Sequence, residues 1–154
     1  AQKTDGTRHN LLSVALDGTL TMDGNAVLLF SLNEVCQSIK EFKEHFGIAE
    51  DSIDYYILHQ AQKLILDGIA RECDIDSKKV LTSYEEYGNT STATLPITIC
   101  NNVEELQKKE HVRLYLCGYG VSLAWSSVVV ELDTECILPI EVTDYCYNDL
   151  QNVQ

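Results

Sequence analysis

The stretch Asp54–Cys73, DYYILHQAQKLILDGIAREC, decides the fold, because it joins a short apolar run to an amphipathic segment. Residues 54–58 are rich in aromatic and branched side chains and stop at His59-Gln60, which predicts a buried strand. Apolar residues then recur at helical spacing, which predicts a helix with one apolar side, formed by Ala61, Leu64, Ile65, Gly68, Ile69 and Cys73.

A longer amphipathic helix is predicted before this unit. From Asn25 the apolar residues step by four and three alternately, over about 20 residues that end at Gly47. We interpret this stripe as core packing; it consists of Leu28, Leu32, Val35, Ile39, Phe42 and Phe46. Residues 1–24 carry repeated Asp-Gly turn signals between short apolar pieces.

Downstream, Gly88-Asn89-Thr90-Ser91 opens a predicted third helix that runs towards Asn101, with Pro96 tolerated near its first turn. Residues 112–117 and 126–132 are predicted strands joined by a loop that contains Gly118-Tyr119-Gly120-Val121-Ser122. The tail holds one more strand-like piece, Cys136 to Val142. Helices alternate with strands, which predicts a layered α/β domain, and 154 residues suit one domain.

Charge and composition exclude several classes of partner. The chain has 11 basic and 24 acidic residues, a net charge of −13, which repels phosphate backbones and anionic membranes. No apolar run approaches the roughly 20 residues that cross a bilayer. We therefore expect neither nucleic acid nor a membrane as a partner.

Six cysteines are present, and no two are spaced as CxxC, so a zinc or thioredoxin motif is absent. They are Cys36, Cys73, Cys100, Cys117, Cys136 and Cys146. No secretory signal opens the sequence, so we expect a reduced, cytoplasmic protein with no metal and no cofactor.

Three candidates for chemistry stand out, although each has a structural explanation of its own. His59 ends a hydrophobic strand, where α/β folds place ligand sites, but many such histidines are simply part of the core. Asn89 lies thirty positions later at a helix start, where Asn is also a common cap. The glycines of the 118–122 loop permit positive φ, and they lack the spacing of a dinucleotide-binding motif.

Taken together, these segments are far more specific. His-Gln-Ala-Gln at 59–62, Tyr-Gly-Asn-Thr-Ser at 87–91 and Gly-Tyr-Gly-Val-Ser-Leu-Ala-Trp at 118–125 occur in that order, preceded by Met22-Asp23-Gly24. The series, over about residues 20 to 132, resembles the C-terminal half of the β-ketoacyl-acyl-carrier-protein synthase III (3-oxoacyl-ACP synthase III) family of the thiolase superfamily. The resemblance implies one half of a thiolase-like fold, with a mixed sheet of four to five strands covered by helices.

The resemblance also implies a chemistry. The family condenses an acyl group, held on a cysteine, with malonyl carrier protein by decarboxylative Claisen chemistry in fatty acid biosynthesis. Its Cys-His-Asn site places the His on His59 and the Asn on Asn89, both as hydrogen-bond donors to the thioester oxygen. His59 would then act as a neutral imidazole. The glycine-rich loop at Gly120 and Val121 would supply a backbone N–H to a second oxyanion hole. The side-chain amide of Gln62 would contact the catalytic residues rather than the substrate.

The chain departs from the family pattern at several points. The nucleophilic cysteine belongs to the N-terminal half, and none of the six cysteines here has a suitable setting; Cys117 lies nearest but ends a strand. Gln62 stands where the family usually has Asn, and Val121 and Ser122 replace common glycines. The basic patch for an acidic carrier protein is thin on the helix after His59.

From this reading we expect a half-domain over residues 1–132 and an acidic extension over 133–154 that either adds a strand or contacts a partner. The expected partners are acyl and malonyl thioesters of coenzyme A or acyl carrier protein, the missing N-terminal half, and a second copy in a full-length dimer. Alone, the chain would be inactive.

Other functions stay open on the sequence. The chain fits a non-catalytic binding module built on a half-fold, or a subunit that pairs with a separately encoded N-terminal half. It also fits another condensing enzyme with a Cys-His-Asn site, such as a type III polyketide or hydroxymethylglutaryl synthase.

Overall fold

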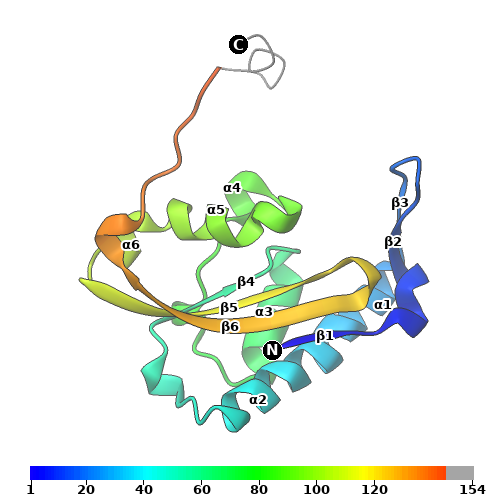
Figure 1. The fold of residues 1–154 in the computed structure, drawn as a ribbon, viewed down its shortest axis with the longest axis horizontal. Coiled ribbons are helices and arrows are strands. Elements are labelled where there is room, and N and C mark those ends of the chain that lie inside the picture. The colour runs from blue at the N-terminus through cyan, green and yellow to red at the C-terminus, as the bar shows by residue number, and fades with distance from the viewer. Residues whose placement is uncertain (145–154) are drawn as a thin grey trace.

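A four-stranded mixed sheet organises the computed structural model, which describes residues 1–144 (Figure 1). The strand order is β1-β6-β5-β4, with bounds Gln2–Thr4, Ala124–Asp133, His111–Gly120 and Tyr55–Leu58 respectively. β4 and β5 run parallel, while the β5–β6 and β6–β1 pairs are antiparallel. Helices lie on both faces of the sheet (Figure 1), so the expected mixed α/β sheet is confirmed.

The long helix predicted before the strand unit is present on one face of the sheet. It comprises α1 (Gly24–Phe30), a π-helical turn (Ser31–Val35) and α2 (Cys36–His45). The Asp23 side chain caps it by accepting a hydrogen bond from the Ala26 N–H at 3.0 Å. At the other end, Gly47 has φ +60°, a conformation that ends helices.

The helix after His59 is α3 (Lys63–Glu72), which lies beside α2 on the same face (Figure 1). Its close approach to the long helix favours a glycine. A Cβ built on Gly68 would lie 2.5 Å from Cδ2 of Leu32, so any side chain there would push Leu32 aside. The strand–helix unit predicted from residues 54–73 is therefore confirmed.

The opposite face carries α4 (Tyr84–Tyr87), α5 (Thr94–Asn101) and α6 (Val103–Leu106) (Figure 1). The third helix begins later than expected, at a 3₁₀ turn over Ser91–Ala93 that leads into α5. Gly88, at φ +66°, separates α4 from this turn. Pro96 lies in the first turn of α5, where its missing N–H costs nothing.

Two local predictions are wrong. Gly118 and Gly120 do not form a loop, because they lie inside β5, and neither has a left-handed backbone conformation. The turn is Val121–Leu123, and its left-handed residues are Ser122 (φ +60°) and Leu123 (φ +49°). The strand expected over Cys136 to Val142 is also absent: a 3₁₀ turn covers Thr134–Cys136, and no strand follows up to residue 144.

The absence of that strand has a chemical reason, since Pro139 cannot donate to a sheet ladder. Ile137 is nevertheless buried against the core, so the start of the tail is part of the packed structure. The rest of the expected extension, residues 145–154, lies outside the described residues. The division between 132 and 133 stays a prediction.

The N-terminal segment holds short strands that the sequence did not reveal. Besides β1, a 3₁₀ helix (Gly6–Leu11) precedes a hairpin of β2 (Leu12–Val14) and β3 (Leu20–Met22). Three residues are too few to display an alternating pattern, whereas the Asp-Gly signal at 17–18 correctly predicted the turn. Gly18 has φ +84° there.

The core is divided between the two faces of the sheet, as alternation along β5 requires. Tyr115 points towards α1, α2 and α3, where it packs with Phe42 and Tyr56. Its neighbour Leu114 belongs to a second cluster that includes Leu106. Within residues 1–144, no helix is long and apolar enough to cross a membrane.

A buried polar network ties the end of β4 to the opposite helices. Gln60 is fully buried, and its Nε2 donates to the Leu58 carbonyl at 2.7 Å. Its Oε1 accepts the Ser83 N–H at 2.9 Å. The Ser83 hydroxyl in turn lies 2.7 Å from the Thr98 hydroxyl on α5. Gln60 thus provides hydrogen-bond partners for buried backbone groups that water does not reach.

Replacing this amide should destabilise the fold. Gln60→Leu keeps the size of the side chain but leaves the Ser83 N–H unpaired, so we expect the free energy of unfolding to fall by about 1–3 kcal/mol. Urea denaturation followed by circular dichroism measures this. The matched control is Gln62→Leu, at an exposed position where the effect should stay within about 0.5 kcal/mol. Equal effects at the two positions would contradict the network.

Candidate active site

The site begins where the parallel strands β4 and β5 end, because their carboxyl ends meet at one edge of the sheet. His59 directly follows β4, and its N–H donates to the Cys117 carbonyl at 2.8 Å. Two residues on, the Tyr119 hydroxyl donates to the His59 carbonyl at 3.2 Å. The two rings meet edge to face with centroids 5.2 Å apart. The histidine is therefore fixed by backbone and side chain together.

The imidazole of His59 is half-buried and has a single described hydrogen-bond partner. Nδ1 lies 2.9 Å from the hydroxyl of Thr94, at the start of α5. Burial lowers the pKa of His59 from its ordinary 6.5, because the charged form loses hydration and no carboxylate compensates. The ring is consequently neutral at pH 7, with Nε2 left for another molecule.

Asn89 lies in the connection between α4 and α5, on the surface. Its Oδ1 accepts the Ser91 N–H at 2.9 Å, while the Ser91 carbonyl accepts the backbone N–H of Thr94 and lies 3.0 Å from the Thr94 hydroxyl oxygen. A chain of hydrogen bonds therefore links Asn89 to Thr94 and His59, although residues 1–144 contain no direct His59–Asn89 bond. Because Oδ1 is engaged, the amide N–H groups of Asn89 are the part available to donate.

The loop residues lie at the same end of the sheet. Gly120 ends β5 in an extended conformation with φ 170°, and Val121 is 46% exposed beside it. Ser122 occupies the left-handed region, which suits glycine better than serine. The loop is anchored from the N-terminal segment, since the Asp5 N–H donates to the Leu123 carbonyl at 3.0 Å.

Gln62 is exposed and contributes to the structure through its backbone. It caps α3 with its carbonyl, which accepts from the N–H groups of Ile65 and Leu66 at 3.1 and 3.2 Å, and its side chain forms no cap bond. The buried amide of this motif is Gln60 instead. A supporting role for the Gln62 side chain stays a prediction.

The sequence did not identify two residues that hold His59. Thr94 is separated from it by 35 positions and carries no motif of its own, so only the fold brings the two together. Tyr119 lies within the quoted glycine-rich segment, and this position was the available signal for its bond to the His59 carbonyl.

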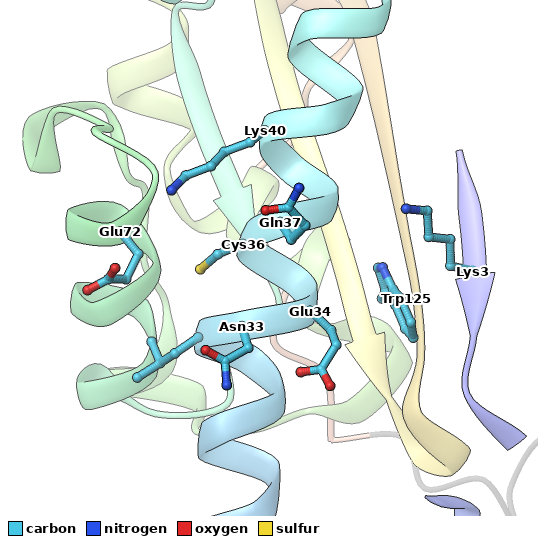
Figure 2. Close-up of a pocket in the computed structure, with 9 residues that line it drawn as sticks. Lys3, Asn33, Glu34, Cys36, Gln37, Lys40, Glu72 and Trp125 are labelled. Carbon is cyan, nitrogen blue, oxygen red and sulfur yellow. The ribbon is translucent and has the colours of Figure 1, made fainter. Parts of the chain in front are cut away.

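A groove of about 550 Å³ lies elsewhere, between α2, α3 and the edge of the sheet (Figure 2). Figure 2 shows Lys40 and Cys36 on the long helix, Glu72 on α3, and Lys3 with Trp125 on the strands. Its lining mixes charges of both signs and includes neither His59 nor Asn89. The groove is therefore not part of the candidate site.

The described cysteines do not provide a nucleophile next to His59. Cys117 is fully buried on β5, and burial raises the pKa of its thiol to about 12. Such a thiol is neutral at pH 7 and inaccessible to a substrate. Residues 1–144 also contain no group of three or more side chains that could hold a metal ion.

Alkylation should therefore distinguish the cysteines. With iodoacetamide at mildly alkaline pH, we expect peptide mass spectrometry to find Cys136, which is exposed, modified well before Cys117. Unfolding in urea should abolish the difference. Rapid native labelling of Cys117 would contradict its burial and reopen it as a nucleophile.

The titration of His59 should couple to stability. As pH falls below 6.5, the unfolded chain binds a proton that native His59 does not, so stability is lost until the native pKa is reached. His59→Gln should reduce this loss when urea denaturation is compared between about pH 7.5 and 5.5. An NMR titration that places the His59 pKa at or above 6.5 would refute the assignment.

Comparison with known proteins identifies the fold and the family. A profile of the family described as 3-oxoacyl-[acyl-carrier-protein (ACP)] synthase III, C terminal, matches residues 44–132. The β-ketoacyl-[acyl-carrier-protein] synthase III of Streptococcus gordonii is 36% identical over 146 residues, covering 85% of this chain and 45% of that protein. The enzyme of Streptococcus pyogenes is 37% identical over 116 residues, covering 74% and 36%.

Solved structures of this family have the same fold as the chain. The 3-oxoacyl-(acyl-carrier protein) synthase of Burkholderia xenovorans LB400 superimposes with a TM-score of 0.83 at 26% identity, covering 92% of this chain and 46% of that one. The synthase III of Aquifex aeolicus VF5 gives 0.74 at 26% identity, covering 86% and 43%. The expected thiolase-like half-fold is confirmed, and the chain spans less than half the length of these relatives. The chain belongs to the 3-oxoacyl-[acyl-carrier-protein] synthase III family and carries its C-terminal domain.

Proposed function

We propose that this chain is the C-terminal half of an enzyme that condenses an acyl thioester with a malonyl thioester, and that it supplies the His and Asn of a Cys-His-Asn site. One observation carries the proposal: His59, held neutral by burial, shares a chain of hydrogen bonds with Asn89 at one end of the sheet. Two neutral donors directed at the same substrate oxygen would stabilise a developing oxyanion.

In the proposed reaction, Nε2–H of His59 and Nδ2–H of Asn89 donate to the carbonyl oxygen of the malonyl thioester. The bond to the carboxylate carbon breaks, carbon dioxide leaves, and the electron pair forms an enolate whose oxygen carries the negative charge. Neutral donors stabilise this charge without delivering a proton to the carbanion, whereas a protonated His59 would quench it.

The carbanion would then attack an acyl group held as a thioester on a cysteine. A carbon–carbon bond forms, and the cysteine thiolate leaves as the tetrahedral oxyanion collapses. The backbone N–H of Val121 is the proposed donor to that oxyanion, and Gly120 precedes it as the last residue of β5. Val121 can fill this role despite its side chain, because only the backbone is used.

The cysteine must come from an N-terminal half, either continuous with Ala1 or separately encoded. Cys117 cannot serve, since it is buried and its thiol is neutral at pH 7. The face of the sheet that carries α5 retains exposed apolar surface, with Val128 at 48% exposure. We propose that the N-terminal half packs against this face. The chain alone would be inactive, and the complete enzyme would be a dimer.

The proposed substrates are acyl and malonyl thioesters of acyl carrier protein or coenzyme A. This half offers little positive charge for an acidic carrier. On α3 next to the site, Lys63 is paired with Asp67 at 2.8 Å, and Leu64 is 63% exposed. Carrier docking would therefore depend on charge supplied by the N-terminal half.

The test uses the chain joined to, or mixed with, its N-terminal half. His59→Ala and Asn89→Ala should each lower the rate of carbon dioxide release from a malonyl thioester about 10²–10³-fold, the typical loss of an oxyanion-hole donor. The control is His45→Ala, an exposed histidine on α2. If both site variants release carbon dioxide and condense at the wild-type rate, the chain is a non-catalytic binding module.

A further inference from the structure

We propose that Thr94 positions His59 by donating its hydroxyl proton to Nδ1, so that the neutral imidazole carries its own proton on Nε2. The inference rests on the proposed function, because only this tautomer can donate to a thioester oxygen from Nε2. Thr94 would touch no substrate; it would act through His59.

The geometry makes the position of one proton decisive. The Thr94 hydroxyl oxygen lies 2.9 Å from Nδ1 of His59 and 3.0 Å from the carbonyl oxygen of Ser91, and Thr94 is only 1% exposed. A hydroxyl has one proton to donate. If that proton goes to Ser91, Nδ1 must carry a proton and donate to the hydroxyl oxygen, which leaves a neutral ring with a bare Nε2. If it goes to Nδ1, the ring proton is on Nε2.

The surroundings of the hydroxyl favour donation to the ring. The Ser91 carbonyl already accepts the backbone N–H of Thr94, so it is satisfied without the hydroxyl. Nδ1 of His59, by contrast, has Thr94 as its single partner within residues 1–144. The histidine therefore has more to gain from the proton than the carbonyl has.

Thr94 is itself held in place by the buried polar network. Its carbonyl accepts a hydrogen bond from the Thr98 hydroxyl at 2.7 Å, and Thr98 is linked through Ser83 to Gln60. Gln60 directly follows His59 in the chain. The network thus fixes the hydroxyl of Thr94 and the ring of His59 relative to each other from both ends, as supporting residues behind a reactive group must.

The wild-type chain provides the first test, without any substitution. Nitrogen NMR of the imidazole, recorded at a pH where the ring is neutral, distinguishes a protonated ring nitrogen from a bare one. We expect Nε2 to be protonated and Nδ1 to be a hydrogen-bond acceptor. A spectrum with the proton on Nδ1 would overturn the proposal.

Variants separate positioning from mere stability. Thr94→Val removes the hydroxyl and should release the preference for one tautomer, whereas Thr94→Ser should keep it. Thr134→Val is the matched control, a buried threonine whose hydroxyl donates to the Lys109 carbonyl, outside the network of Gln60, Ser83 and Thr98. It should lower stability while leaving the ring signals unchanged. Ring signals that respond equally to both valine substitutions would overturn the proposal.

In the assembled enzyme, Thr94→Val should lower kcat about 10–100-fold with little change in KM, a loss of the size seen when the hydrogen-bond partner of a metal-bound histidine is removed. Thr94→Ser should restore the rate. The two proposals fail separately. A proton on Nδ1, combined with loss of activity in His59→Ala, defeats the positioning role alone, whereas full activity of His59→Ala defeats the proposed function.

Discussion

The buried carboxamide of Gln60 is the constraint on which the site depends. It bonds to the end of β4 through the Leu58 carbonyl and to the opposite layer through the Ser83 N–H, with no exposure to water. A buried amide without these partners would cost free energy, so the strand end and the helical layer must stay in register. His59 precedes this amide directly, and Thr94 is joined to the same network through Thr98. These hydrogen bonds therefore connect His59 to the packed core and restrict its position.

Burial of the same region sets the chemistry. The ring of His59 is sheltered enough to lower its pKa, yet its Nδ1 has a neutral hydroxyl as partner rather than a carboxylate. A carboxylate would favour the imidazolium form, which donates protons as well as hydrogen bonds. With a hydroxyl as partner the imidazole stays neutral, which the proposed reaction requires if His59 is to stabilise an enolate without protonating it.

The sequence predicted the parts of the fold whose signals are local and repeated. The apolar stripe before Gly47 and the run that ends at His59 were long or dense enough to define a helix and a strand. The three-residue strands in the first 24 positions have no such signal. The turn at Ser122 was not predicted, because the glycines that indicated a loop lie inside β5. His59 and Asn89 were singled out as candidates from motifs, whereas Thr94 was not, because its hydrogen bond to His59 depends on a contact between layers.

The most direct measurement is a crystal structure of the assembled protein with a stable malonyl thioester analogue, in which carbon dioxide cannot be lost. The account predicts that the thioester oxygen lies within about 3 Å of both Nε2 of His59 and Nδ2 of Asn89, while Nδ1 remains on the Thr94 hydroxyl. An analogue that binds with its carbonyl oxygen away from both side chains would contradict it.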